Sequence, residues 1–467
     1  MGKYKELLSN TLIFALGSFG SRFISFFLVP LYTNILSKEQ YGVADLITTV
    51  SNLAVPLFSV VIQDAILRFV LSGKHKSSIV FKNSFLVLLI GSLLSIPLIP
   101  LLNLYAPLAE WKWYIYIILI TNMFSNVMYA YTRSLEKNKI YAVAGIINSF
   151  FLAIANIIFL LFLKLDIEGY LLANIGAHII SIIFLMISTK AFRDIRKEKI
   201  DFPLLKQMVC FSAPLIINNL SWWVLNSSNR IMIQFFCSSE ELGLFTAASK
   251  IPNLLSVITS VFSAAWTASS IKECENDNDK TFFANIFKAY SLIMFLGQAI
   301  ILLILKIFMG YYVGEEFYSS WKYVPFILDG AVFFAFSTFY ESIYQALKKS
   351  VRASITTVIA AIVNFLVTFI MINKIGVMAA CIAFFVSYLI LCITRMIDSR
   401  KFFKFNINFL SFALNTIIVT AQGILITLGC NEIICSVVAI SLLLLINITD
   451  IKASVFIVKK IFLKRRK

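Results

Sequence analysis

The chain has 467 residues, of which 60% are hydrophobic and only 14% are charged, and its formal net charge is +17. This composition excludes an ordinary soluble domain, in which about a quarter of the residues are charged. A net charge of this size would suggest nucleic-acid binding in a soluble protein. Here the basic residues are distributed as in a membrane protein, so we expect membrane lipids and no nucleic acid as partners.

Long apolar segments follow one another along the whole chain. A transmembrane helix needs about 20 apolar residues to cross the hydrocarbon core of a bilayer. The sequence predicts fourteen such spans, near residues 11–35, 44–67, 83–102, 114–132, 140–163, 169–188, 211–236, 246–269, 287–308, 324–346, 353–372, 376–394, 409–429 and 434–451. The expected fold is therefore an all-α integral membrane protein.

Lys and Arg are concentrated in every second connection between these spans. If the N-terminus is cytoplasmic, 32 of the 41 Lys and Arg lie on the inner side and seven on the outer side, while Arg22 and Arg230 fall within spans. Positive charge accumulates in the cytoplasmic segments of membrane proteins. The sequence therefore predicts that both termini lie in the cytoplasm.

Parts of the sequence recur at a distance of six spans. The turns after the first and the seventh span share Ser, Glu and Gly at an offset of 201: Ser37, Glu39 and Gly42 match Ser238, Glu240 and Gly243. A Gly-x-x-x-Ala motif recurs at an offset of 207, at Gly169 and Gly376. Because six is even, the two halves should enter the membrane in the same orientation and enclose a central cavity.

The repeat and the charge pattern divide the chain into four expected parts. They are an N-terminal six-helix half (1–190), a cytoplasmic amphipathic linker (191–206), a C-terminal six-helix half (207–397), and two final helices with a basic tail (398–467). The linker is expected because basic residues from Lys190 to Lys206 alternate with apolar ones, a pattern typical of helices that lie on a membrane surface.

The order of several loose motifs resembles one known family. The segments Leu16–Arg22 (LGSFGSR), Leu28–Leu36 (LVPLYTNIL) and Glu39–Gly42 (EQYG) look like the opening of Wzx-type polysaccharide flippases. These belong to the multidrug/oligosaccharidyl-lipid/polysaccharide exporter superfamily. Arg133–Tyr141 (RSLEKNKIY) is similar to the inner-loop pattern of the family, and Ala264-Ala265-Trp266 occupies its eighth-helix position.

This resemblance implies a substrate and a biological context. The substrate would be an isoprenoid-diphosphate-linked oligosaccharide, moved across the bacterial cytoplasmic membrane for the synthesis of O-antigen, capsule or exopolysaccharide. A polysaccharide polymerase and a chain-length regulator would be partner proteins, and no cofactor is implied.

Two arginines within spans are candidate substrate contacts. An ion inside a membrane is costly, so such residues usually face a cavity or a partner, and the arginine fork suits bidentate binding of phosphate. Arg22 lies near the middle of its span. Arg230 shares one helical face with Trp223 and Asn226, which we expect to look inward. For Arg22 a structural ion pair with another helix is the alternative, and for Trp223 the alternative to stacking on a sugar is packing or an interfacial anchor.

Four further ionisable residues are candidates at other spans. Asp64 and Arg68 are four residues apart near the inner end of the second span, where they could serve a cavity or form a local salt bridge. Glu341 and Asp329, in the tenth span, are candidate ion-coupling residues because burial would favour their protonated forms. Glu341 is preferred because it sits well inside the span, whereas the alternative for Asp329 is a position at the outer interface. The alternative for Glu341 is an ion pair with a Lys or Arg at the inner end.

Other transport functions are compatible with this predicted architecture. A peptidoglycan-precursor lipid flippase is the nearest alternative, since it also handles a lipid diphosphate. A drug or cation antiporter would favour carboxylates over Arg22 in its first helices. We do not expect an enzyme, a cofactor or a metal, because the chain has only His75 and His178, no Gly-rich phosphate loop and no H-E-x-x-H motif.

Overall fold

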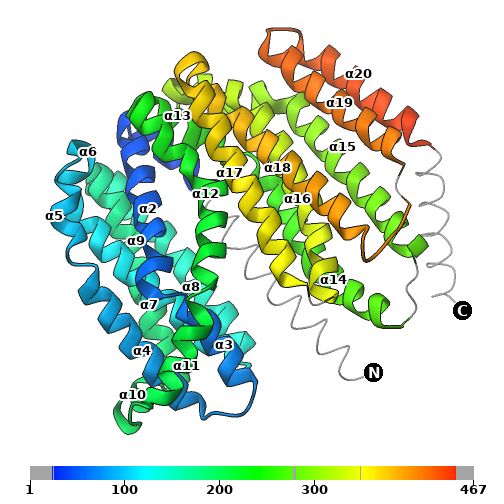
Figure 1. The fold of residues 1–467 in the computed structure, drawn as a ribbon. Helices are drawn as coiled ribbons and strands as arrows, with labels where there is room; N and C mark the ends of the chain where they lie inside the picture. The colour runs from blue at the N-terminus through cyan, green and yellow to red at the C-terminus, as the bar shows by residue number, and fades with distance from the viewer. Residues whose placement is uncertain (1–23, 25, 277–279, 348, 407, 449–467) are drawn as a thin grey trace, which may run out of the picture. The chain divides into compact units, whose positions relative to one another are not determined.

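The computed structural model describes residues 24, 26–276, 280–347, 349–406 and 408–448 (Figure 1). Within these ranges the secondary structure is helical, without a β-strand. The chain forms two compact units, unit 1 up to Thr246 and unit 2 from Ala247 onward. The predicted all-α membrane fold is confirmed, whereas the expected division into halves of 1–190 and 207–397 stays a prediction.

Unit 1 holds the predicted linker and the seventh span together with the first six. Its helices are Phe26–Ile35, α2 (Lys38–Ser59), α3 (Ile62–Leu71), α4 (Ser77–Leu94), α5 (Leu98–Leu102), α6 (Ala106–Ala109), α7 (Lys112–Ser134), α8 (Asn138–Asn156), the π-helix η1 (Ile157–Phe162), α9 (Asp166–Thr189), α10 (Ala191–Lys197), α11 (Phe202–Ser212), α12 (Leu215–Phe236) and most of α13 (Ser239–Ala248). In Figure 1, α3 and α10 lie at one end of this unit and α5 and α6 at the other.

Unit 2 begins with the last two residues of α13. Its helices are α14 (Asn253–Asn276), α15 (Lys280–Tyr312), the 3-10 helix η2 (Glu315–Tyr323), α16 (Val324–Ala346), α17 (Ser350–Ile375), α18 (Val377–Ser399), α19 (Phe409–Thr427) and α20 (Glu432–Ile446). Aromatic rings fill the core of this unit around Trp266, whose indole N–H donates to the carbonyl of Phe339 (3.1 Å) and whose ring stacks on the Phe339 ring. Such buried rings contribute large apolar areas.

Where the structure describes them, the fourteen predicted spans fall on helices. In the part of the chain that the structure describes, ten helices are long and apolar enough to cross a membrane, and α13 with α14 adds an eleventh. The other three predicted spans fall on α7, which is rich in Ser, Thr and Asn, and on the shorter helices Phe26–Ile35 and α20. Of the first predicted span, residues 11–23 and 25 lie outside the described residues.

The predicted span 44–67 is not one continuous helix. It is divided into α2 and α3 at Val60 and Val61, whose φ angles are 51° and 53°. The left-handed region is strained for β-branched residues. The hydroxyl of Ser59 accepts a hydrogen bond from the backbone nitrogen of Val61 (3.2 Å), which supports the break. An apolar pattern cannot reveal such a break, because both helices remain equally hydrophobic.

The two repeated turns start helices in the same way. The hydroxyl of Ser37 accepts a hydrogen bond from the backbone nitrogen of Gln40 (3.1 Å) at the start of α2. Ser238 accepts the same bond from Glu241 (3.2 Å) at the start of α13. These serines satisfy backbone donors that the first helical turn leaves open, so the sequence repeat has a structural counterpart.

The two helices cross at a glycine from each, which we call the glycine crossing (Gly42 on α2 and Gly243 on α13). A Cβ atom added at Gly42 would lie 2.0 Å from the carbonyl oxygen of Ser239, and one added at Gly243 would lie 2.0 Å from that of Lys38. Lys38 and Ser239 are themselves related by the offset of 201. The contact is therefore reciprocal, as expected around a two-fold axis, and it requires glycine on both sides.

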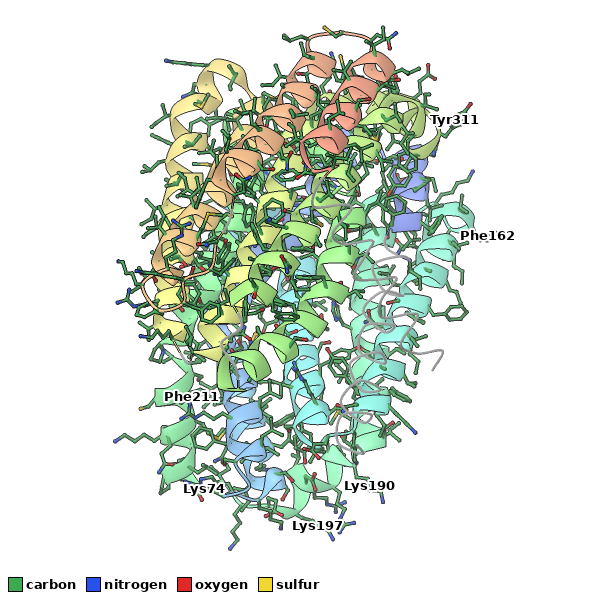
Figure 2. The ribbon with its side chains drawn as sticks, turned by 90° about the vertical axis from the view of Figure 1, so that its right-hand side faces the viewer. Lys74, Phe162, Lys190, Lys197, Phe211 and Tyr311 are labelled. Atoms are coloured by element: carbon green, nitrogen blue, oxygen red, sulfur yellow. The ribbon has the colours of Figure 1, made fainter. Side chains whose placement is uncertain are left out.

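The linker between α9 and α11 is held at one end of unit 1 by residues of α4. The carboxylate of Glu198 accepts hydrogen bonds from Lys76 and from Ser78, the latter at 2.9 Å. Asn83 donates to the carbonyl of Asp201 (2.8 Å) and accepts from its backbone nitrogen (3.1 Å). Figure 2 shows Lys74, Lys190 and Lys197 at this end. The linker is thus docked on its own unit, and only its residues Ala191–Lys197 form a separate helix.

The glycine crossing should not tolerate a side chain. We expect Gly42→Ala and Gly243→Ala each to lower the stability of the purified protein by about 1–3 kcal/mol, because backbone atoms must move apart. The control is Gly145→Ala on α8, where an added Cβ meets no atom within 4 Å. Thermal unfolding in detergent measures the difference. Equal stability of Gly42→Ala and Gly145→Ala would contradict the close crossing.

The docking of the linker on unit 1 should depend on pH and weaken in acid. The hydrogen bonds from Lys76 and Ser78 hold the pKa of the Glu198 carboxyl below its ordinary value. A lowered pKa means that ionised Glu198 favours the docked state at neutral pH. This contribution begins to fall near the ordinary pKa of about 4.3 and is lost as the pH falls through the lowered pKa.

A spin label at Lys197→Cys, in a variant without the natural cysteines, can follow this release. We expect a restrained label at pH 7 and a more mobile one at pH 3.5, whereas Glu198→Gln should give the mobile spectrum at both. A spectrum of the Glu198 protein that does not change with acid would show that its carboxylate does not hold the linker.

Candidate functional site

Arg230 forms an ion pair with an aspartate that the sequence analysis did not select. Its Nε lies 2.6 Å from Oδ2 of Asp45 on α2, and the two side chains are only 17% and 10% exposed. The hydroxyl of Thr246 donates to the same carboxylate oxygen (3.0 Å), and Nη1 of Arg230 donates to the carbonyl of Asn226 (2.9 Å). The pair joins α12 to α2 within unit 1.

Thr246 follows Asp45 at the repeat offset of 201, so the hydrogen bond between them joins two equivalent positions of the repeat. It lies one helical turn beyond the glycine crossing along both helices. The close approach at Gly42 and Gly243 brings α13 within reach of α2, and the Asp45 carboxylate then receives donors from both α12 and α13.

Of the other two candidates on α12, Trp223 contacts α2 and Asn226 is exposed. The indole N–H of Trp223 donates to the carbonyl of Thr49 (3.3 Å), so Trp223 and Arg230 both contact α2. Asn226 is exposed, and its side-chain amide donates to the carbonyl of Trp222 (2.8 Å). Of the residues predicted to share an inward face, Trp223 and Arg230 contact α2 as expected, whereas the expectation is wrong for Asn226.

Asp64 and Arg68 lie on α3 as expected, but no ion pair joins them in the described part of unit 1. The guanidinium of Arg68 lies over the ring of Phe211 on α11, with 4.5 Å from Cζ to the ring centroid. This is a cation–π contact. Arg22 lies outside the described residues.

In unit 2, Glu341 pairs with a fully buried arginine on α18. Nη1 of Arg395 donates to Oε2 of Glu341 (3.0 Å) and to the carbonyl of Ser337 (2.9 Å). Its Nε and Nη2 donate to the hydroxyls of Thr356 (3.2 Å) and Thr357 (3.1 Å) on α17. Arg395 thus links α16, α17 and α18, and Glu341 has the basic neighbour that the alternative interpretation of the sequence described.

Asp329 is the other carboxylate of α16, and it has a different environment. Its side chain is 1% exposed, and its Oδ1 accepts a hydrogen bond from the amide of Gln298 on α15 (2.5 Å). A neutral amide compensates a buried negative charge less than a guanidinium does. The two candidate ion-coupling residues therefore differ in their partners, since Glu341 has a guanidinium and Asp329 has a neutral amide.

Sequence reasoning missed Asp45 and Arg395 for definable reasons. Asp45 lies close to the outer end of its predicted span, where a carboxylate does not by itself indicate a functional site. Arg395 was counted as an inner-side charge just beyond a span, but α18 continues to Ser399 and takes it one turn inside the helix. The repeat held one usable signal, because the offset of 201 aligns Asp45 with Thr246.

Apolar helices of spanning length, with arginine–carboxylate pairs among them, define a multi-pass membrane protein. The chain belongs to the family described as "Polysaccharide biosynthesis protein", which matches residues 7–267. No curated protein matches the sequence significantly.

Several solved structures share the fold. The lipid II flippase MurJ in its inward closed conformation gives a TM-score of 0.66 at 14% identity, over 96% of this chain and 100% of that one. An inward-facing multidrug resistance MATE family transporter of the MOP superfamily gives 0.64 at 15% identity, over 81% and 97%. MATE in complex with MaD3S gives 0.60 at 15% identity, over 85% and 95%. At these identities the likeness establishes the fold alone.

The Asp45–Arg230 pair should be coupled in its effect on stability. Arg230→Gln leaves a carboxylate buried without its counter-ion, and we expect a loss of about 3–5 kcal/mol. The double variant Asp45→Asn/Arg230→Gln should recover much of this loss, because neither charge remains. Arg68→Gln, which removes a cation–π contact in the same unit, is the control for losing an arginine. Additive effects of the two single changes, measured by thermal unfolding in detergent, would contradict the pairing.

Proposed function

We propose that this protein is a flippase that moves an isoprenoid-diphosphate-linked oligosaccharide across the cytoplasmic membrane for polysaccharide synthesis. The membership of the polysaccharide biosynthesis family carries this proposal. The fold supports it, because a flippase for another lipid-linked substrate has the same fold. The charge asymmetry of the connections supports cytoplasmic N- and C-termini.

Arginines within spans fit the chemistry of this substrate. A diphosphate carries negative charge on several oxygens, and the arginine fork binds such groups in a bidentate way. We assign this contact to Arg22, supported by Arg230. In the structure Arg230 forms an ion pair with Asp45. A diphosphate at this position would therefore compete with the Asp45 carboxylate for the guanidinium. Trp223, Asn226, Asp64 and Arg68 are proposed as further contacts of the substrate.

Energy for transport would come from a cation gradient acting on a buried carboxylate. Glu341 is paired with the guanidinium of Arg395. Asp329 is buried deeper and is bonded to the neutral amide of Gln298. We therefore propose Asp329 as the first candidate for carrying a proton and keep Glu341 as the second.

A multidrug or cation antiporter is the second candidate function, because MATE transporters share the fold. A peptidoglycan-precursor flippase remains an alternative within the lipid-diphosphate class. Export of an organic cation by the purified protein, with no movement of a lipid-linked glycan, would favour the antiporter. Rescue of a host depleted of its peptidoglycan-precursor flippase would favour the other alternative.

The role of Arg22 can be tested in cells that need this protein to export their polymer. We expect Arg22→Ala to abolish export while the protein remains inserted, and Arg22→Lys to retain part of it, because charge survives while the bidentate fork is lost. Arg193→Gln, at an exposed arginine of α10, is the matched control. Polymer at the cell surface is measured against the amount of protein in the membrane. Normal export by Arg22→Ala would refute the contact.

Coupling can be tested in proteoliposomes with an imposed pH gradient. We expect the gradient to accelerate substrate movement by the wild type and by Glu341→Gln, and Asp329→Asn to lose this response while keeping the movement seen without a gradient. A full response of Asp329→Asn together with a lost response of Glu341→Gln would move the assignment to Glu341. A wild type that ignores the gradient would refute proton coupling.

A further inference from the structure

Unit 2 contains a cavity that the proposed transport site does not use. It has a volume of about 630 Å³. Its lining residues come from the start of α17 and from the last part of α18: Lys349, Val351, Arg352, Ile355, Thr356, Ile359, Thr394 and Asp398. Its mouth lies at the connection between α16 and α17, which the charge pattern places on the cytoplasmic side.

Two cations are held together at this mouth by one aromatic ring. Nζ of Lys349 lies 3.6 Å from the centroid of the Phe402 ring, and Cζ of Arg352 lies 4.7 Å from the same centroid. Arg352 also donates to Oδ1 of Asp398 (2.8 Å). Lys401 also lies 3.6 Å from Oδ1 of Asp398, so three cations surround one carboxylate at this site.

Below the charged mouth the wall of the cavity is apolar and open to the surroundings of the helix. Val351, Ile355 and Ile359 on α17 are 74%, 53% and 42% exposed. Ile355 and Ile359 lie within the predicted span 353–372, where the surroundings are hydrocarbon. The site therefore combines a cationic rim at the level of lipid headgroups with an apolar groove that leads into the bilayer.

We propose that this cavity binds one anionic membrane phospholipid from the cytoplasmic leaflet. The phosphodiester would lie between Lys349 and Arg352, and one acyl chain would follow Ile355 and Ile359. Basic pockets between transmembrane helices on this side of a membrane are suited to acidic headgroups. The phosphodiester would meet two cations here, while the Asp398 carboxylate is held by Arg352 and Lys401. The proposal is independent of the transported glycan.

The purified full-length protein can be tested by native mass spectrometry and by lipid titration in detergent. Phosphatidylglycerol should bind more tightly than phosphatidylcholine with the same acyl chains, and soluble glycerol phosphate should not displace it. Lys349→Gln/Arg352→Gln should weaken phosphatidylglycerol binding by about fivefold for each cation removed, which corresponds to about 1 kcal/mol each. Lys374→Gln, at the opposite end of α17, is the control and should bind like the wild type.

A second variant tests the groove without altering charge. Ile359→Trp should fill the path of the acyl chain and weaken binding while Lys349 and Arg352 remain. The proposal is overturned by equal binding of the two lipids by the wild type, by unchanged binding by the double variant, or by displacement by glycerol phosphate at the same concentration as the lipid. Displacement of phosphatidylglycerol by equimolar farnesyl diphosphate would assign the cavity to the transport substrate and overturn the proposal. This conclusion would hold even if the variants flip the glycan as the wild type does.

Discussion

A charged side chain among apolar helices must have a partner, and this constraint organises the interior of both units. Asp45 with Arg230 in unit 1 and Glu341 with Arg395 in unit 2 are ion pairs between different helices. In each pair the arginine also donates to a backbone carbonyl, of Asn226 or of Ser337. Removing one partner would leave the other charge uncompensated. The pairs therefore hold their helices together, and an anionic ligand at Arg230 would compete with a carboxylate for the guanidinium.

The sequence repeat also has structural consequences near the Asp45–Arg230 pair of unit 1. Gly42 and Gly243 let two equivalent helix starts approach until backbone meets backbone, and Asp45 then bonds to Thr246, its own equivalent. Both helix starts have a serine cap and a glycine at equivalent positions. The sequence repeat is therefore matched by contacts between equivalent residues in this part of unit 1. Arg230 adds α12 to the same contact.

Much of the fold follows from the sequence because the hydrocarbon thickness imposes the length of each helix. The fourteen apolar segments were recognisable, and the spacing of Trp223 and Arg230 gave their common direction. The break at Val60 and Val61 was not recognisable, since it depends on backbone angles and leaves the apolar pattern unchanged. Asp45 is 185 residues from Arg230, and a single sequence gives no sign of so distant a partner. The docking of the linker on Lys76 and Asn83 was missed for the same reason.

The central claim is that the protein moves a lipid-linked glycan, and translocation by the purified protein tests it most directly. A polyprenyl-diphosphate oligosaccharide with a fluorescent sugar is placed in both leaflets of proteoliposomes, and a membrane-impermeant quencher is added outside. The account predicts that protein-containing vesicles lose nearly all fluorescence with time, whereas empty vesicles lose only the outer half. Equal, partial quenching in both kinds of vesicle, from protein shown to be folded and inserted, would contradict it.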